Sequence, residues 1–219
     1  MLNLVCLDRD GTINKDEDYY LGSTNDWKLK VEILPKVAEG IKKLNKLENV
    51  ATFIITNQAG VALCDEKFRE LTENRMHEVN EYIIDILRKN RAMVDGYFAC
   101  PYVDLKYVEK AKKKGLDIDW RYVREKNEDL KPNIGMIKKA ANSLCKRLEE
   151  CNIFVIGDRA SDVQLGLNAG GRGILIEGWK TRKEGDVEKV AMLGMENPGR
   201  VYIAKDFLDA ADYVAFREF

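Results

Sequence analysis

The sequence lacks several features that would narrow its function at once. Its 36 lysines and arginines oppose 37 aspartates and glutamates, so the formal net charge is only −1. This balance argues against electrostatic capture of nucleic acid or of an acidic membrane surface. No apolar run is long enough to cross a bilayer, and the opening residues reach charge too soon for a secretory signal. We therefore expect a cytoplasmic protein that binds neither nucleic acid nor membrane.

Cysteine and histidine are also scarce. The five cysteines are odd in number and form no Cys-x-x-Cys pair, which favours reduced thiols over disulfides. The single histidine, His77, lies in a polar helical stretch and is expected at the surface rather than as a catalytic base. The chain has 219 residues, 45% of them hydrophobic, which suffices for one sizeable α/β domain with its own core.

Apolar, β-rich runs alternate with helical patterns along the chain. The expected strands are Leu2–Leu7, Val50–Ile55, Val94–Ala99, Ile153–Ile156, Gly173–Ile176 and Val201–Ile203. The expected helices are Pro35–Leu47, Glu66–Arg88, Asn133–Leu148 and Asp162–Asn168. This alternation predicts an α/β fold, a doubly wound, Rossmann-like parallel sheet whose ligand crevice lies beyond the carboxyl ends of the strands.

Three segments interrupt the alternation. Residues 14–34 are expected to form a flap after the first strand, and Asp186–Gly199 a surface insertion before the last one. Residues 101–130 are highly charged and form a small insert, too short to be a separate cap domain. We therefore expect a single domain over residues 1–219 with no large cap. We also expect it to be a monomer whose crevice is fairly open to solvent.

The insert carries an excess of basic side chains. Two interpretations stay open: these residues attract a second phosphate of the substrate, or they keep an exposed helix solvated. The residues are Lys106, Lys110, Lys112, Lys113, Lys114, Arg121 and Arg124.

Polar side chains follow three of the predicted strands and precede one helix. They are, in chain order, Asp8, Asp10, Thr56, Asn57, Gln58, Lys131, Asp158 and Asp162. The strongest signal is the pair of carboxylates spaced by one residue, because Gly11 beside them permits the bend that turns both toward a crevice.

These groups match the needs of phosphoryl transfer. One carboxylate can act as a nucleophile and form an acyl-phosphate, and a second carboxyl group can protonate the leaving oxygen and then activate water. Thr56 and Lys131 can stabilise the charge on the phosphoryl oxygens. Clustered oxygens from Asp8, Asp158 and a main-chain carbonyl suit Mg²⁺.

The segments DRDGT, TNQ, KP and GDRASD, in this order, resemble the motifs of haloacid dehalogenase (HAD) superfamily phosphatases from Leu2 to about Leu175. The DRDGTIN start, the TNQAG loop and Cys100-Pro101 are similar to the heptose-bisphosphate and histidinol-phosphate phosphatase branch. The resemblance implies that Asp8 is the nucleophile and Asp10 the general acid/base, with the Asp10 backbone carbonyl on the metal.

The resemblance also implies roles for the other positions. Thr56 and Lys131 would hold the phosphoryl group, and Asp158 would ligate Mg²⁺. Asp162 would either lie behind the metal ligands or be an outer ligand itself, and Arg159 would either contact substrate or form a salt bridge near Asp162. The residues expected to face the substrate are Asn57, Gln58 and Gly60.

Members of this branch often carry a zinc loop, and here the sequence departs from the pattern. Tyr102 stands where a histidine would be, and Asp129 and Leu130 precede Lys131 instead of cysteine and arginine. The thiol of Cys100 alone cannot make a structural zinc site, which needs four ligands. We therefore expect Mg²⁺ and no zinc. Because the arginine that helps hold the substrate in this branch is missing, the sequence does not identify a residue that binds the far end of the substrate.

Several substrates fit these motifs. A small phosphorylated metabolite is favoured, in particular a sugar phosphate such as heptose bisphosphate, with histidinol phosphate and a nucleic-acid 3′-phosphate as alternatives. A non-catalytic phospho-acceptor or binding protein is disfavoured, because Asp10 would speed hydrolysis of a phosphate on Asp8.

Overall fold

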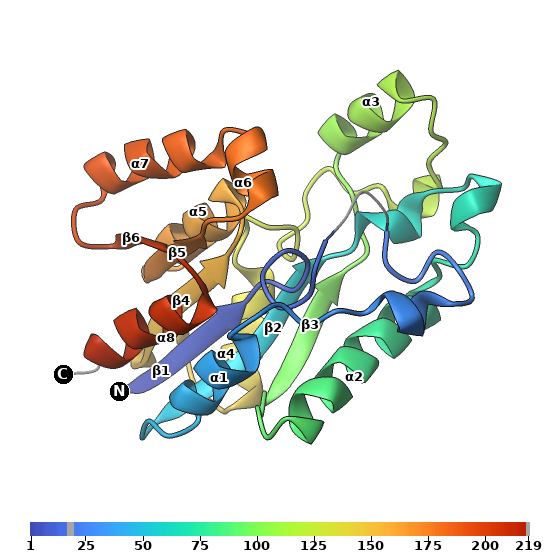
Figure 1. Cartoon of the computed structure of the whole chain (residues 1–219). Coiled ribbons are helices and arrows are strands. Elements are labelled where there is room, and N and C mark those ends of the chain that lie inside the picture. Colours follow the sequence, from blue (N-terminus) through green and yellow to red (C-terminus); the bar gives the residue numbers. More distant parts are fainter. Residues whose placement is uncertain (17–19, 218–219) are drawn as a thin grey trace.

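Parallel strands form the centre of the molecule (Figure 1). The structure is a computed structural model, and it describes residues 1–16 and 20–217. The sheet order is β3-β2-β1-β4-β5-β6, and every neighbouring pair is parallel. The strands are β1 (Leu2–Leu7), β2 (Val50–Asn57), β3 (Gly96–Cys100), β4 (Cys151–Gly157), β5 (Arg172–Ile176) and β6 (Val201–Ala204). The predicted Rossmann-like sheet is confirmed, and β1 and β4 flank the point where such a fold places its crevice.

Helices connect the strands. Within the described residues the α-helices are α1 (Val37–Leu44), α2 (Glu73–Lys89), α3 (Leu105–Lys113), α4 (Gly135–Ser143), α5 (Ala160–Asn168), α6 (Trp179–Lys183), α7 (Asp186–Glu196) and α8 (Phe207–Phe216). Short 3₁₀ helices are η1 (Trp27–Lys30), η2 (Ala59–Ala62), η3 (Glu66–Phe68), η4 (Trp120–Tyr122) and η5 (Leu148–Glu150).

The four predicted helices are present with shifted ends. Pro35 lies outside α1, because the next residue, Lys36, has left-handed backbone geometry with φ of 65° and cannot continue a helix. The second helix begins at residue 73 instead of 66, because the Thr72 hydroxyl accepts a hydrogen bond from the Arg75 amide at 3.1 Å and caps it there.

The segment Asp186–Gly199, expected as a surface insertion, has regular secondary structure. Most of this segment is α7, whose Val190 is fully buried against Val163, Leu167 and Leu175. The helix therefore packs on α5 and β5 along one face, while most of its other side chains are exposed or half-buried. Helices α3, α6 and α8 likewise have no counterpart among the predicted elements.

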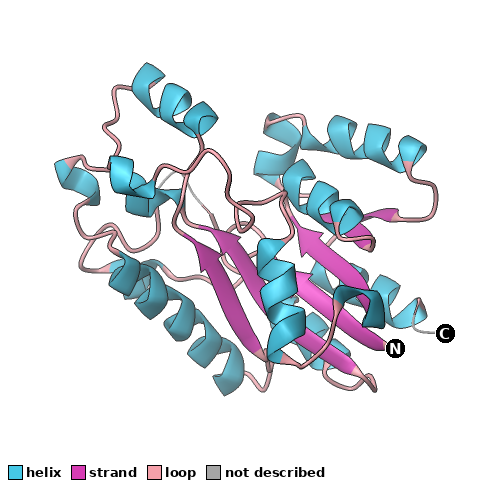
Figure 2. Ribbon diagram, turned by 180° about the vertical axis from the view of Figure 1, so that it is seen from behind, coloured by secondary structure: helices cyan, strands magenta, loops and turns pink. Residues whose placement is uncertain are grey.

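The helices cover the sheet from both sides, as Figures 1 and 2 show. Helices α1, α2 and α8 pack on one face, and α4 and α5 pack on the other. Because successive side chains of a strand point to opposite faces, Val5 and Leu7 join the first core and Leu4 and Cys6 join the second. Both faces of β1 are thus buried, which fixes its carboxyl end firmly.

The insert of residues 101–130 packs against the loop that follows β2 through two small apolar clusters. Tyr20 of the flap reaches both segments: its hydroxyl lies 3.2 Å from the Tyr107 hydroxyl, and its ring meets Phe68 edge-on at 5.1 Å between centroids. The flap, the insert and the loop after β2 therefore meet beyond the carboxyl edge of the sheet.

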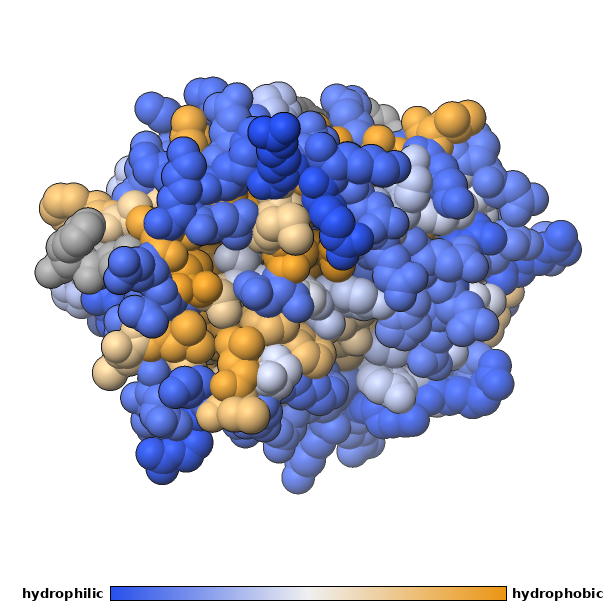
Figure 3. All heavy atoms as spheres, turned by 90° about the horizontal axis from the view of Figure 1, so that it is seen from below, coloured by the Kyte–Doolittle hydropathy of each residue, from blue (hydrophilic) through white to orange (hydrophobic). Residues whose placement is uncertain are grey.

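The surface is largely hydrophilic on the underside of the molecule, with apolar atoms gathered toward one side (Figure 3). Trp27 of the flap is only 3% exposed and packs edge-on against Tyr82, so it is a packing residue. His77 is exposed, as predicted, and its Nδ1 lies 2.8 Å from the Tyr97 hydroxyl. Among the described helices, none combines the length and the apolar character needed to cross a membrane.

Candidate active site

A cavity of about 290 Å³ opens where β1, β2 and β4 end. All ten residues singled out in the sequence line it: Asp8, Asp10, Thr56, Asn57, Gln58, Gly60, Lys131, Asp158, Arg159 and Asp162. The structure adds Asp16, Tyr20, Leu21, Ala59 and Ser161 to this lining. The neighbouring strands bring the motifs together because parallel strands end at one edge of the sheet.

Lys131 lies at the centre of the crevice and is shared by two carboxylates. Its ammonium donates to Asp8 Oδ1 at 2.5 Å and to Asp162 Oδ1 at 2.7 Å, and all three side chains are at most 9% exposed. Burial opposes the charge on Lys131, but the two carboxylates raise its pKa above the ordinary value. The lysine is therefore a fixed positive charge beside Asp8.

Three carboxylates face one another beside this single ammonium. Oxygens of Asp8, Asp158 and Asp162 all lie within 4.8 Å of one another. Burial, reinforced by the neighbouring carboxylates, raises the pKa of Asp8 to about 7 and that of Asp158 to about 8. Asp158 Oδ1 is buried and has no hydrogen-bond partner among the residues that the structure describes. An excess of buried negative charge with an unsatisfied oxygen is the environment that a hard divalent cation fits.

Gly11 permits this close arrangement. Its φ of 90° lies in the region that favours glycine, and a Cβ at this position would collide with the Asp158 carboxylate. Gly11 therefore has two roles: it allows the chain to turn after β1, and it leaves space for the Asp158 carboxylate to lie close to the first motif.

The raised pKa values predict a pH-dependent stability of the metal-free protein. Between the ordinary aspartate pKa of about 3.9 and the folded values, the folded state binds protons that the unfolded chain does not. In chelator, the Tm should therefore fall as pH rises through this window and level off above about pH 8. Because Mg²⁺ competes with these protons, its stabilising effect should be larger near pH 8 than near pH 6.

Thermal unfolding with and without saturating Mg²⁺ at both pH values measures this difference. Asp158→Asn is the matched control, because it removes one titrating carboxylate and should shrink the pH dependence of the Mg²⁺ effect. An equal Mg²⁺ effect at the two pH values would contradict the assignment of the cation to these carboxylates.

The polar residues at the end of β2 contact the site's own side chains. Asn57 Oδ1 accepts from the Lys131 amide at 3.1 Å, which fixes the backbone that carries the ammonium. Gln58 Nε2 donates to Thr56 Oγ1 and to Asp10 Oδ2, each at 2.8 Å. In this structure the amides of Asn57 and Gln58 thus position other groups of the crevice.

Gly60 forms part of the crevice wall in the same loop. A Cβ there would press on the ring of Tyr20 and on Leu71 at about 2.9 Å, so this position lets the flap pack closely onto the loop after β2. Tyr20 itself lines the crevice.

Arg159 pairs with carboxylates in the neighbourhood of Asp162 and not with Asp162 itself. Its guanidinium pairs with Glu184, lies 3.4 Å from Asp158 Oδ2 and 3.6 Å from Asp186. Asp162 instead accepts from the Arg159 backbone amide at 3.2 Å and caps the start of α5. The side chain is 26% exposed and still borders the crevice.

Asp10 is held by a group that the sequence analysis missed. Although burial opposes ionisation, the Arg9 guanidinium, with further hydrogen bonds from Gln58 and Asn14, holds the pKa of Asp10 below its usual range. Arg9 is itself only 1% exposed. The available signal was its position between the two carboxylates of the first motif, where a charged side chain must find a partner.

The positions of the zinc loop form ordinary polar contacts. Cys100 Sγ accepts a hydrogen bond from Asn127 Nδ2 at 3.3 Å, and Asp129 forms an ion pair with Lys139 at 2.5 Å. Over residues 1–16 and 20–217, Cys100 takes part in no group of three potential metal ligands.

The basic side chains of the insert lie outside the described lining of the crevice. Arg121 is 85% exposed and pairs with Asp119 at 2.7 Å, and the Arg124 guanidinium stacks over Tyr102 at 4.8 Å from the ring centroid. This geometry favours the interpretation that these residues solvate and brace the insert.

We therefore expect the double variant Arg121→Gln/Arg124→Gln to retain kcat/KM within about threefold for both a sugar bisphosphate and an aryl monophosphate. Steady-state kinetics on the two substrates checks this. A selective fall with the bisphosphate would show instead that the insert holds a second phosphate.

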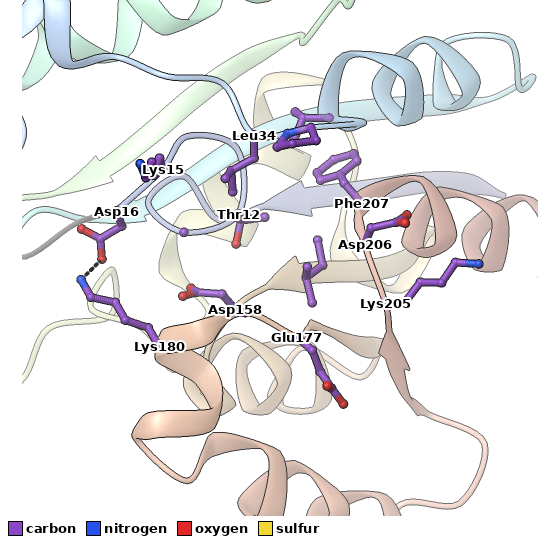
Figure 4. A pocket seen from close by; sticks show the side chains of 15 residues that line it. Thr12, Lys15, Asp16, Leu34, Asp158, Glu177, Lys180, Lys205, Asp206 and Phe207 are labelled. Atoms are coloured by element: carbon purple, nitrogen blue, oxygen red, sulfur yellow. Dashed lines mark hydrogen bonds and ion pairs between the residues drawn. The ribbon is translucent and has the colours of Figure 1, made fainter.

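A larger cavity, of about 750 Å³, also borders Asp158 (Figure 4). It shares Asp16 and Asp158 with the crevice, and Asp16 forms an ion pair with Lys180 at 2.6 Å, drawn dashed in the figure. Leu34 and Phe207 give this cavity an apolar wall. Asp8, Asp10 and Lys131, for which the sequence predicts the catalytic roles, all line the smaller crevice, which is therefore the candidate active site.

A doubly wound sheet with a buried Asp-Lys-Asp cluster and a further carboxylate at its crevice is the arrangement expected of a phosphoryl-transfer hydrolase. The HAD-hydrolase-like family pattern matches residues 130–210. A D-glycero-β-D-manno-heptose-1,7-bisphosphate 7-phosphatase of Rhodopseudomonas palustris is 33% identical over 172 residues, covering 78% of this chain and 82% of the relative. A D-glycero-α-D-manno-heptose-1,7-bisphosphate 7-phosphatase of Campylobacter jejuni is 31% identical over 183 residues, covering 82% of this chain and 84% of the relative.

The fold agrees with these relatives. A crystal structure of D,D-heptose 1,7-bisphosphate phosphatase from B. bronchiseptica, complexed with magnesium and phosphate, superposes with a TM-score of 0.68 over 99% of both chains at 20% identity. The chain belongs to the HAD-like hydrolases, in the branch of the heptose-bisphosphate phosphatases, and it is a phosphoric monoester hydrolase.

Proposed function

We propose that this enzyme removes a phosphate from a small phosphorylated sugar, with a heptose bisphosphate as the first candidate, through an aspartyl-phosphate on Asp8. The observation that carries the proposal is the placement of Asp8 at the end of β1. Lys131 neutralises one of its oxygens at 2.5 Å, and the crevice gives access to substrate. The choice of sugar rests on the names of the relatives that cover most of the chain.

The side chains would divide the reaction between them. An Asp8 oxygen attacks phosphorus, and the bond from phosphorus to the leaving oxygen breaks. Because the pKa of Asp10 is lowered in the substrate-free site, this carboxylate must first take up a proton as the phosphate dianion binds beside it, and it then passes that proton to the leaving oxygen. Water then attacks the aspartyl-phosphate, Asp10 takes its proton, and the bond from phosphorus to Asp8 breaks to release phosphate. Thr56 and Lys131 would neutralise the phosphoryl oxygens in both steps.

Asp8, Asp158 and the Asp10 backbone carbonyl would hold Mg²⁺, with Asp162 behind them. The unpartnered Asp158 Oδ1 and the three clustered carboxylates support this assignment. A bound Mg²⁺ would offset the repulsion between the phosphate dianion and these carboxylates.

Phosphate release from a panel of substrates tests the proposal. The panel should contain both anomers of D-glycero-D-manno-heptose 1,7-bisphosphate, histidinol phosphate and a 3′-phosphorylated oligonucleotide. We expect the highest kcat/KM with one heptose bisphosphate. A higher value with histidinol phosphate or with the oligonucleotide would replace the proposed substrate class while keeping the chemistry.

Metal analysis gives a separate prediction. Because one thiol and an acid already paired with Lys139 stand at the zinc-loop positions, the purified protein should hold less than one zinc per chain. Chelation should abolish activity, and Mg²⁺ alone should restore it. Stoichiometric zinc that survives dialysis, with a loss of folding on its removal, would contradict this prediction.

The chain is proposed to act as one catalytic domain and as a cytoplasmic monomer, with residues 14–34 and 101–130 as walls of the crevice. The contact of Tyr20 with Tyr107 supports the joint role of the two walls. Sedimentation equilibrium of the active enzyme would show whether a dimer forms instead.

A further inference from the structure

Arg9 is a fully buried arginine whose side chain turns away from Asp8. Its guanidinium grips both oxygens of Asp10: Nε donates to Oδ1 at 3.0 Å, and Nη2 donates to Oδ2 at 2.6 Å. Two parallel hydrogen bonds from a planar guanidinium fix the direction of a carboxylate as well as its charge. The orientation of Asp10 is therefore set by the residue beside it in the chain.

Arg9 is in turn anchored from behind. Its Nη1 donates to Asn80 Oδ1 at 3.0 Å, and Asn80 Nδ2 donates to the Met76 carbonyl one turn earlier in α2 at 2.8 Å. Asn80 is completely buried. The guanidinium is thereby tied to a long helix of the scaffold and has no freedom to follow Asp10 if the carboxylate swings away.

Asp10 receives two more donors on its other sides. Asn14 Nδ2 donates to Oδ1 at 3.1 Å, and Gln58 Nε2 donates to Oδ2 at 2.8 Å. Gln58 also accepts from Arg9 Nη2 at 2.9 Å and donates to Thr56, so the network reaches the residue expected to hold the phosphoryl group. Each oxygen of Asp10 therefore has two N–H donors, while the side chain stays 27% exposed toward the crevice.

We infer that Arg9 is a positioning residue that aims the Asp10 carboxylate at the water of the second half-reaction. This inference rests on the proposed function. In that step the water oxygen bonds to phosphorus, the bond from phosphorus to Asp8 breaks with its electron pair returning to Asp8, and the water proton passes to Asp10. Water has no covalent tether, so its activation depends on the direction of the base more than the first step does.

The first half-reaction with an aryl phosphate should be much less sensitive. An aryl oxide is a good leaving group and needs little proton donation, so phosphorylation of Asp8 should proceed even when Asp10 is misdirected. A merely structural role for Arg9, as a satisfied buried charge, would instead change both half-reactions alike or change only stability.

Rapid-quench kinetics with 4-nitrophenyl phosphate separates the two roles. Arg9→Met should lower kcat by about 10²-fold, accumulate phospho-enzyme in the steady state and change the rate of its formation by less than about threefold. Arg9→Lys should fall between Arg9→Met and wild type, because one ammonium cannot grip both oxygens. Asp10→Asn sets the upper limit of the effect.

Arg200→Met is the matched control. Arg200 is a partly buried arginine that donates to the Leu167 and Gly171 carbonyls, away from the crevice, and its loss should leave the ratio of the two rates unchanged. If Arg9→Met does not fold, Arg9→Lys and Asn80→Ala carry the same test, the latter by loosening the anchor of Arg9. Equal slowing of both half-reactions in the folded variants overturns the inference. Absence of phospho-enzyme in Asp10→Asn would instead count against the proposed function.

Discussion

Asp8→Asn should reduce Mg²⁺-dependent phosphate release by about 10⁴-fold or more, because the amide cannot form the acyl-phosphate through which both half-reactions pass. The variant should also form no phospho-enzyme after a quench. Burial raises the pKa of Asp8 to about 7, so its ionised form is unfavourable in the metal-free fold. Near pH 8 in chelator, the neutral amide should therefore leave the Tm no lower than that of wild type.

The same variant should lose most of the stabilisation by Mg²⁺, since one of three clustered carboxylates no longer supplies a charged ligand. This combination separates the proposed role from a folding defect. A folded Asp8→Asn protein that retained turnover would end the covalent mechanism. A large drop in Tm in chelator would show that Asp8 is needed for the fold.

Lys131→Met should combine a loss of activity with a loss of stability. Without the ammonium, Asp8 and Asp162 lose their shared cation, and among the described side chains only the Arg159 guanidinium, 3.4 Å from Asp158 Oδ2, remains beside the three buried carboxylates. Removal of one partner of a buried ion pair typically costs about 3–5 kcal/mol. For a chain of this size that corresponds to a fall in Tm on the order of 10 °C. Activity should fall by about 10²–10³-fold, because a preorganised charge on the phosphoryl oxygens is gone.

A double variant distinguishes the two effects. Lys131→Met/Asp162→Asn removes one of the unpaired carboxylates and should recover part of the Tm, without recovering activity. Mg²⁺ should also stabilise Lys131→Met more than it stabilises wild type. If activity returned with stability in the double variant, the lysine would be acting on the fold alone.

Much of the crevice could be predicted from local patterns. Asp8, Thr56 and Asp158 each follow an apolar run that has the length and composition of a buried strand, and parallel strands end at a common edge. Knowledge of which runs are strands therefore suffices to bring these residues together, without knowledge of any individual contact. Gly11 could be anticipated in the same way, because a tight turn after a strand requires a residue that tolerates positive φ.

The errors concern segments whose structure depends on distant partners. α7 buries only one of its apolar side chains fully, Val190, which packs against Val163 of α5 and Leu175 of β5. The start of α2 depends on one cap at Thr72 in a polar stretch that permits several starts. Periodicity reports the backbone's own preference, and tertiary packing routinely overrides it at the ends of elements.

The sequence by itself determined the class of chemistry, because carboxylates, a hydroxyl and a lysine at strand ends and a helix start converge in any fold with this strand order. Only the tertiary structure decided the partners of each charge. Arg9 could have paired with either neighbouring carboxylate, and Asn80, 71 positions away on α2, holds it toward Asp10. Lys131 is likewise shared between two carboxylates, Asp8 after β1 and Asp162 in the first turn of α5. Such choices depend on how the helices pack on the sheet, because buried charges must take the partners that packing brings within reach.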